Sequence, residues 1–200
     1  MPGILGTDLA HRDPDRPPAV RTPARGGAWR DPHNPRVVLL ARGGRGWSAL
    51  SRLVSAAHTA GERGDPGVDW DLLEEFVVPG DLRVLLGPDS QVGRAIGRHR
   101  FDLADRLLDR WRQVAGHQVY LEIVNHRTAP RDPGRQRPGP DPSTPMPRRM
   151  WTYATERKMP AVLTNAVRYI HPRQAATADL LDAIRRLVPL DSRHLDRENS

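Results

Sequence analysis

Cysteine is absent from this 200-residue chain, and Lys158 is its only lysine. Without cysteine, the chain can form no disulfide, no thiolate metal site and no cysteine nucleophile. No apolar run approaches the about 20 residues that a membrane span requires. The first ten residues also lack the basic segment and the long apolar core of a signal peptide. We therefore expect a soluble, cytoplasmic protein that has no membrane partner.

Apolar residues are scarce as well, at 38% of the chain, whereas proline occurs 20 times. The shortage is concentrated in residues 11–35 and 127–149, which are rich in arginine and proline and show no hydrophobic period. Such segments cannot bury enough apolar surface to offset the entropy lost on ordering. We predict a mobile loop over residues 11–35 and a disordered insertion over residues 127–149. The insertion interrupts one α/β domain of residues 36–197, and residues 1–10 form a candidate barrel strand.

The net charge is +7, and almost all of the positive charge comes from arginine. Arginine suits phosphate contacts, but an arginine excess also follows from nucleotide composition bias. The 127–149 segment holds six arginines against two aspartates. It is therefore the first candidate for non-specific DNA contact, and a solvated loop is the alternative. The candidate nucleic-acid-binding residues are Arg127, Arg131, Arg135, Arg137, Arg148 and Arg149.

Four apolar runs of strand length begin at Arg36, Leu82, Val119 and Ala161. Each run is followed further along the chain by apolar residues at helical spacing, and the clearest example is residues 101–115. Strands that alternate with helices are typical of an α/β sheet or barrel with parallel strands. That is the fold class we predict.

The helical stretches also show which side chains should be buried. The helix after the glycine-rich turn is predicted to bury a face that includes Trp47 and Leu50, and Ser90 is a candidate N-cap for a later helix. A last helix after Pro172 is predicted from the spacing of Ala176, Leu180, Ala183, Ile184 and Leu187.

Four motifs follow one another along the chain: LLAR at 39–42, GPDSQVGRAI at 87–96, EIVNH at 122–126 and TNAVRY at 164–169. In this order they resemble the PHP (polymerase and histidinol phosphatase) domain of bacterial DNA polymerase III alpha subunits. The resemblance covers most of residues 36–197. It implies a partial, distorted (β/α)7 barrel of parallel strands.

The resemblance also implies where metal ligands would lie. The family pattern T-N-D-x-H-Y carries a ligand Asp and a ligand His, and these positions hold Ala166 and Arg168 here. A strand that usually begins with a ligand histidine begins with Arg36. An alanine methyl group has no lone pair, and a guanidinium has only donors, so neither binds a divalent metal. Asp8 and His126 are the remaining candidates, as vestigial ligands; otherwise Asp8 is a surface aspartate and His126 a hydrogen-bonding residue.

Three functions follow from these residues. The first is a structural, non-catalytic segment of a DNA polymerase III alpha subunit in DNA replication, without a cofactor, whose partners are the rest of that subunit or other replisome subunits. The second is a phosphoesterase or 3′–5′ exonuclease that uses Zn, Mn or Mg through Asp8, Glu122 and His126. The third is a free-standing basic protein that binds DNA through residues 127–149. The polymerase carboxylates themselves have no counterpart on a predicted strand.

Overall fold

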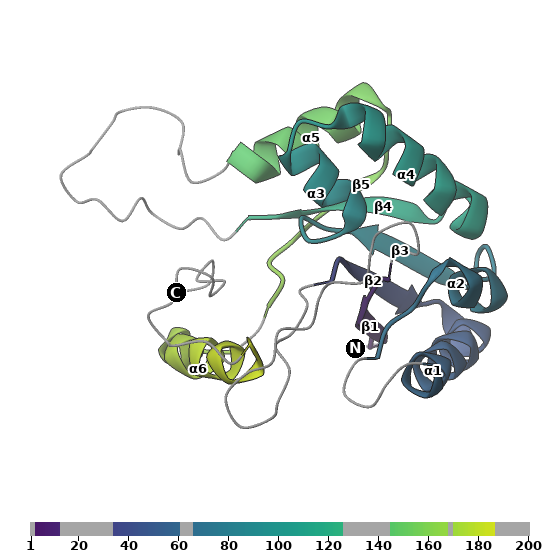
Figure 1. Ribbon diagram of the computed structural model, residues 1–200, viewed down its shortest axis with the longest axis horizontal. Coiled ribbons are helices and arrows are strands. Elements are labelled where there is room, and N and C mark those ends of the chain that lie inside the picture. Colours follow the sequence, from purple (N-terminus) through teal and green to yellow (C-terminus); the bar gives the residue numbers. More distant parts are fainter. Residues whose placement is uncertain (1–2, 13–33, 61–65, 126–144, 168–169, 187–200) are drawn as a thin grey trace.

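The computed structural model describes residues 3–12, 34–60, 66–125, 145–167 and 170–186. They form a mixed α/β fold in which helices flank one five-stranded sheet (Figure 1). The strands are β1 (Gly6–Ala10), β2 (Arg36–Ala41), β3 (Leu82–Leu86), β4 (Val119–Val124) and β5 (Ala161–Thr164). The helices are α1 (Gly43–Thr59), α2 (Trp70–Phe76), α3 (Gln91–Gly97), α4 (Phe101–Ala115), α5 (Pro145–Glu156), the short 3-10 helix η1 (Pro172–Gln174) and α6 (Ala175–Arg186).

The sheet is mixed, with its strands in the order β1-β2-β3-β4-β5. β1 pairs antiparallel with β2, and β2 antiparallel with β3, whereas β3, β4 and β5 are parallel. The prediction of parallel strands is therefore wrong for the β1–β2 and β2–β3 pairs. A strand's direction depends on the end of the sheet at which its connection re-enters, and hydrophobic periodicity does not encode this. Within the described ranges β1 and β5 are edge strands, and a closed barrel stays an expectation.

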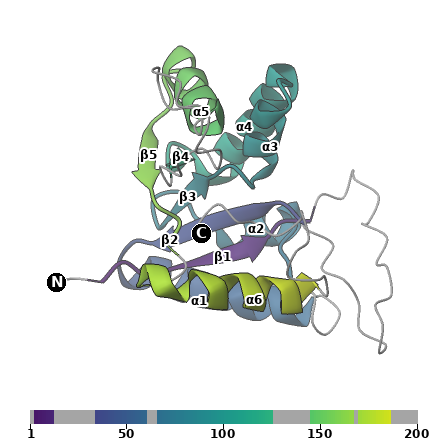
Figure 2. The same cartoon turned by 90° about the vertical axis from the view of Figure 1, so that its left-hand side faces the viewer.

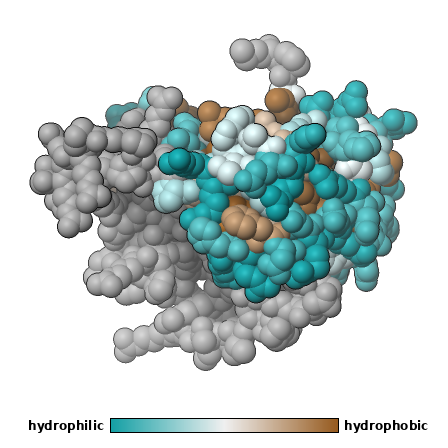
Figure 3. Space-filling model, turned by 90° about the horizontal axis from the view of Figure 1, so that it is seen from above, coloured by the Kyte–Doolittle hydropathy of each residue, from teal (hydrophilic) through white to brown (hydrophobic). Residues whose placement is uncertain are grey.

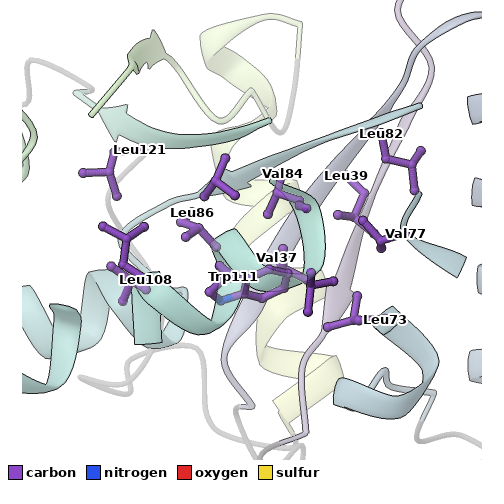
Figure 4. Close-up of a cluster of buried hydrophobic side chains, with 14 of the residues drawn as sticks. Val37, Leu39, Leu73, Val77, Leu82, Val84, Leu86, Leu108, Trp111 and Leu121 are labelled. Carbon is purple, nitrogen blue, oxygen red and sulfur yellow. The ribbon is translucent and has the colours of Figure 1, made fainter. Parts of the chain in front are cut away.

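One face of the sheet carries the core. Alternate residues of each strand point to this face, so Val37, Leu39, Val84 and Leu121 are all buried there under the helices. Figure 4 shows these side chains meeting Leu108 and Trp111 from α4, with Leu73 and Val77 from the α2 region. The predicted apolar stripe of residues 101–115 is confirmed as core, and helix α4 has the predicted bounds.

Helix α1 packs against the core through a stripe that does not include Trp47. Its buried residues include Gly46, Leu50 and Leu53, whereas Trp47 is 50% exposed. A Cβ on Gly46 would lie 2.1 Å from the main-chain oxygen of Asp81, so the helix can approach only where a side chain is missing. The prediction that Trp47 is buried is wrong because the stripe is centred one residue earlier.

Helix α3 begins as the sequence predicts and packs very closely on the turn before it. The Ser90 hydroxyl accepts a hydrogen bond from the Gly93 N–H at 2.9 Å, which confirms the N-cap. A Cβ on Gly93 would lie 2.1 Å from the Gly87 main-chain oxygen and 2.7 Å from that of Pro88. Only glycine allows this approach.

The described residues at the ends of both proline- and arginine-rich segments pack into the fold, contrary to the prediction for those residues. The His11 ring is buried between the rings of Trp70 and Trp111. The main-chain N–H of His11 donates to the main-chain oxygen of Pro35 at 2.8 Å. Helix α5 begins at Pro145, which lies within the predicted 127–149 insertion. Proline lacks only an N–H that the first helical turn leaves unpaired anyway, so prolines at this end are compatible with a helix. The rest of the two segments lies outside the described residues.

Helix α6 lies apart from α3, α4 and α5 in both side views (Figures 1 and 2). Its Leu180 and Ile184 side chains are 49% and 59% exposed, whereas Ala183 is buried. The helix itself was predicted, but these two residues do not join the main core. Leu187 lies outside the described residues. Among the helices that the structure describes, none is long and apolar enough to cross a membrane.

Candidate functional site on the second face of the sheet

The second face of the sheet, away from the core helices, carries the sequence-predicted acidic residues. Asp8 lies opposite Val38 across the β1–β2 pair, and residues opposite each other share a face. The same face continues from Val38 through Leu85 to Tyr120 on β4. Glu122, two residues beyond Tyr120, therefore points to this face as well. The fold thus places both predicted carboxylates on one face.

Asp8 is bound by Arg36 of the neighbouring strand. The Arg36 Nε lies 3.2 Å from each carboxylate oxygen of Asp8, and the Arg36 Nη2 donates to the main-chain oxygen of Asp8 at 2.8 Å. The pair is only partly shielded, since the Asp8 side chain is 51% exposed and the Arg36 side chain 35% exposed. Arg36 stands at a position where the family resemblance implies a metal ligand. Its guanidinium instead supplies the positive charge that Asp8 faces.

Glu122 has a different partner on the other side of the face. Its Oε1 accepts a hydrogen bond from the Thr164 hydroxyl of β5 at 2.7 Å. Its Oε2 lies 2.7 Å from where a Cβ on Gly87 would stand, so the carboxylate extends over the end of β3. Thr164 is the first residue of the TNAVRY motif, and the motif alone does not indicate this hydrogen bond. Its pairing with Glu122 depends on the β4–β5 register, which the sequence does not reveal.

The two acidic residues do not form one site. Strands β2 and β3 separate β1 from β4. Because neighbouring strands lie about 4.8 Å apart, the backbones of Asp8 and Glu122 are about 14 Å apart or more. Metal ions require several ligands within about 2.0–2.6 Å of one point. In the part of the chain that the structure describes, no three His, Asp or Glu residues gather closely enough to hold a metal ion. The described residues therefore do not fit the divalent metal that the resemblance implies.

The remaining predicted metal residues are divided between described and undescribed parts of the chain. Ala166 follows β5 and is exposed, with a φ of 42° in the left-handed region. Asp and Asn adopt this conformation more readily than alanine does. The backbone at this position thus suits the residue that the family pattern implies better than the residue present. His126 and Arg168 lie outside the described residues.

Of the candidate nucleic-acid-binding arginines, the structure describes two. The Arg149 Nη1 donates to the main-chain oxygen of Gly97 at 2.7 Å, so this side chain fastens α5 to α3. Arg148 is exposed on the outer side of α5. The other four, Arg127, Arg131, Arg135 and Arg137, lie outside the described residues.

Comparison with known proteins identifies the family. Residues 4–126 match the PHP domain. The chain belongs to the PHP domain family. This match covers most of the sheet, from β1 to β4, and it confirms the family to which the four sequence motifs pointed.

The PHP chain is also similar to parts of several bacterial DNA polymerases. It is 28% identical over 171 residues to the DNA polymerase III subunit alpha of Xylella fastidiosa strain Temecula1, which covers 84% of this chain and 12% of the relative. It is 36% identical over 112 residues to the error-prone DNA polymerase of Mycolicibacterium paratuberculosis, covering 54% of this chain and 10% of the relative. It is 28% identical over 172 residues to the error-prone DNA polymerase of Nocardia farcinica, which covers 80% of this chain and 14% of the relative. The chain thus spans a small part of these relatives.

Proposed function

We propose that this PHP domain is a structural, non-catalytic segment of a bacterial replicative or error-prone DNA polymerase, acting in the cytoplasm. Its partners are then the remainder of that polymerase or other replisome subunits. The proposal is supported by the polymerase relatives, of which the chain covers 12% and 10%. A segment of this size would contribute to the folding and contacts of the larger protein.

The Asp8–Arg36 pair carries the non-catalytic part of the proposal. A divalent metal at Asp8 would have to displace a guanidinium that contacts both carboxylate oxygens and the main-chain oxygen of the same residue. Arginine remains charged at every physiological pH, so no change of protonation releases it. A metal next to this permanent cation would also be repelled by it. Arg36 therefore disfavours the metal-activated water on which a PHP-type hydrolase would depend.

Metal loading and hydrolysis measured together would test this part. The purified 200-residue chain would be exposed to Zn²⁺, Mn²⁺ or Mg²⁺, desalted and analysed for bound metal, and then assayed on phosphomonoesters and on a 3′-labelled single strand. We expect no stoichiometric metal and no hydrolysis above the background rate. One tightly held metal per chain, with hydrolysis that is lost in His126→Ala, would instead support the phosphoesterase alternative. Arg36→His is the matched variant, because it replaces the cation by a residue able to bind metal.

The size of the gene product in its own cells would test the polymerase part. Peptides of this chain would be detected in a size-separated lysate. A species several times larger than the 22.4 kDa of this chain would identify it as part of a polymerase polypeptide. A species near 22.4 kDa that co-purifies with no polymerase subunit would reject this part of the proposal.

A further inference from the structure

The outer face of α5 presents a tryptophan to solvent. Trp151 is 60% exposed, whereas Met150, Tyr153 and Ala154 of the same helix are buried. Among the residues that the structure describes, no aromatic ring stacks on Trp151 and no cation lies over it. Core packing therefore does not explain the indole at this position, and its flat apolar face is available to a ligand.

Basic residues lie both before and after Trp151 in the chain. Arg148 precedes Trp151 by three residues, which places the two side chains next to each other on a helix. Lys158 follows the end of α5 and is exposed, with a φ of 52°. Residues 145–158 hold four basic residues against Glu156 alone. Viewed from the side of α3, α4 and α5, the surface is mainly hydrophilic with small apolar areas (Figure 3).

The nearby acidic groups are already neutralised. The Arg157 Nη1 donates to Glu156 at 2.9 Å, and Asp105 of α4 accepts hydrogen bonds from the Arg157 Nε at 2.9 Å and the Tyr153 hydroxyl at 2.6 Å. Neither Arg148 nor Lys158 forms an ion pair with any residue in the described ranges. The face therefore offers two uncompensated cations beside one exposed aromatic ring.

Trp47 on α1 provides a contrast within the same molecule. It is 50% exposed, but no residue three or four positions from it on α1 is basic. Of the basic residues further along, Arg45 pairs with Asp81 at 3.1 Å, and the Arg52 guanidinium lies 5.5 Å from the centre of the Phe76 ring. An exposed tryptophan is therefore common to both helices, whereas a basic residue one helical turn away from it occurs only on α5.

We infer that the outer face of α5 binds single-stranded nucleic acid. A base stacks on the Trp151 indole, and the phosphates on either side contact Arg148 and Lys158. A single strand fits this arrangement because its bases expose their faces, whereas a duplex hides them between neighbouring base pairs. The inference does not depend on the role of the chain in a polymerase.

The test is a titration of a fluorescently labelled dT oligonucleotide with the full 200-residue chain, followed by fluorescence anisotropy at several salt concentrations. Trp151→Ala should weaken binding at least about five-fold, since a base–aromatic stack is worth about 1–3 kcal/mol. Trp151→Phe should restore part of the affinity. Arg148→Ala or Lys158→Ala should each lower the slope of log K against log salt by about 0.7. Trp47→Ala is the matched control and should bind within two-fold of the wild type.

Three results of the binding titrations would each overturn the inference. They are no measurable binding to dT at low salt, equal losses in Trp151→Ala and Trp47→Ala, and tighter binding to a duplex than to the single strand. A parallel titration with a U oligonucleotide would show whether the strand is DNA or RNA. Because Trp151 is exposed, its variants should unfold at the wild-type temperature, and circular dichroism would verify this. A large drop in that temperature would also count against the inference, because it would give the indole a structural role.

Discussion

The two faces of the sheet are made by the same strands and differ in almost every other respect. Leu39 is fully buried under the helices, and its neighbour Leu40 is only partly covered on the other face. On the first face, apolar side chains of all five strands lie in the core or pack against it. On the second, Asp8 and Glu122 are each satisfied by a single polar partner. The first face thus determines the fold, and the second carries whatever chemistry the fold can support.

The two faces also differ in how much stability a substitution on them should cost. Burying a large apolar side chain contributes about 1.5–3 kcal/mol, whereas an exposed ion pair contributes about 0–1 kcal/mol. Replacement of residues on the second face therefore costs little stability. The core face tolerates much less change.

The largest expected effect is on the core face. Leu39→Ala should lower the free energy of unfolding by about 2–5 kcal/mol, because it removes buried apolar surface and leaves a cavity. Leu40→Ala, one residue away on the second face, should lower it by less than about half of that amount. Urea denaturation of both variants would measure the difference. Equal losses would mean that the second face is packed as tightly as the first.

A buried hydroxyl in the helical layer should have the next largest effect. The Tyr153 hydroxyl donates to Asp105, which joins α5 to α4. Burial of the side chain, and then this hydrogen bond, hold the pKa of Tyr153 above its ordinary value. Tyr153→Phe should therefore lower the free energy of unfolding by about 1–2 kcal/mol. The control is Tyr120→Phe on the second face, for which we expect no change. Similar losses in both variants would contradict the contrast between the faces.

The rim of the second face should respond in the opposite direction. Ala166→Gly should raise the free energy of unfolding by about 1 kcal/mol, since glycine adopts a positive φ without steric cost. The same substitution at Ala176, an exposed residue of helix α6, should lower it by about 1 kcal/mol. Thermal unfolding of the two variants would reveal the sign directly. A loss of stability at position 166 would show that its backbone is not strained.

The smallest effect should come from the ion pair itself. Arg36→Met should lower the free energy of unfolding by less than about 1 kcal/mol, and 1 M NaCl should reduce the difference further. Arg83→Met is the control, because Arg83 is exposed on the same face and forms no ion pair with a described residue. A loss above about 2 kcal/mol would show that Arg36 holds β1 in place rather than merely neutralising Asp8.

Several elements were predictable because one short-range pattern determines each of them. The β3 and β4 strands and helix α4 have the bounds that their apolar runs predicted. Strand direction in β1 and β2 was not predictable, because it depends on how distant segments meet. The start of α5 is not predictable from composition, because Pro145 is typical of a disordered segment and is equally accepted by the first turn of a helix.

The candidate site was predictable only as a set of residue types. The family resemblance points to Asp8, Arg36 and Glu122, and the fold places their strands in one sheet. The partners were not predictable, since Asp8 and Arg36 are 28 residues apart in sequence and Glu122 and Thr164 are 42 apart. Trp151 gave no signal of its own, because a helical period does not reveal which apolar residue stays outside the core.

The close packing of Gly93 on the Gly87 turn also affects how this sequence can vary. Any side chain at position 93 would collide with main-chain oxygens, which cannot rotate away as a flexible side chain could. Glycine at this position is thus a steric requirement of the close packing between the turn and the helix rather than a preference. Random mutagenesis with selection for folded protein should leave position 93 almost invariant, while the exposed residues 98–100 that follow the helix change more freely.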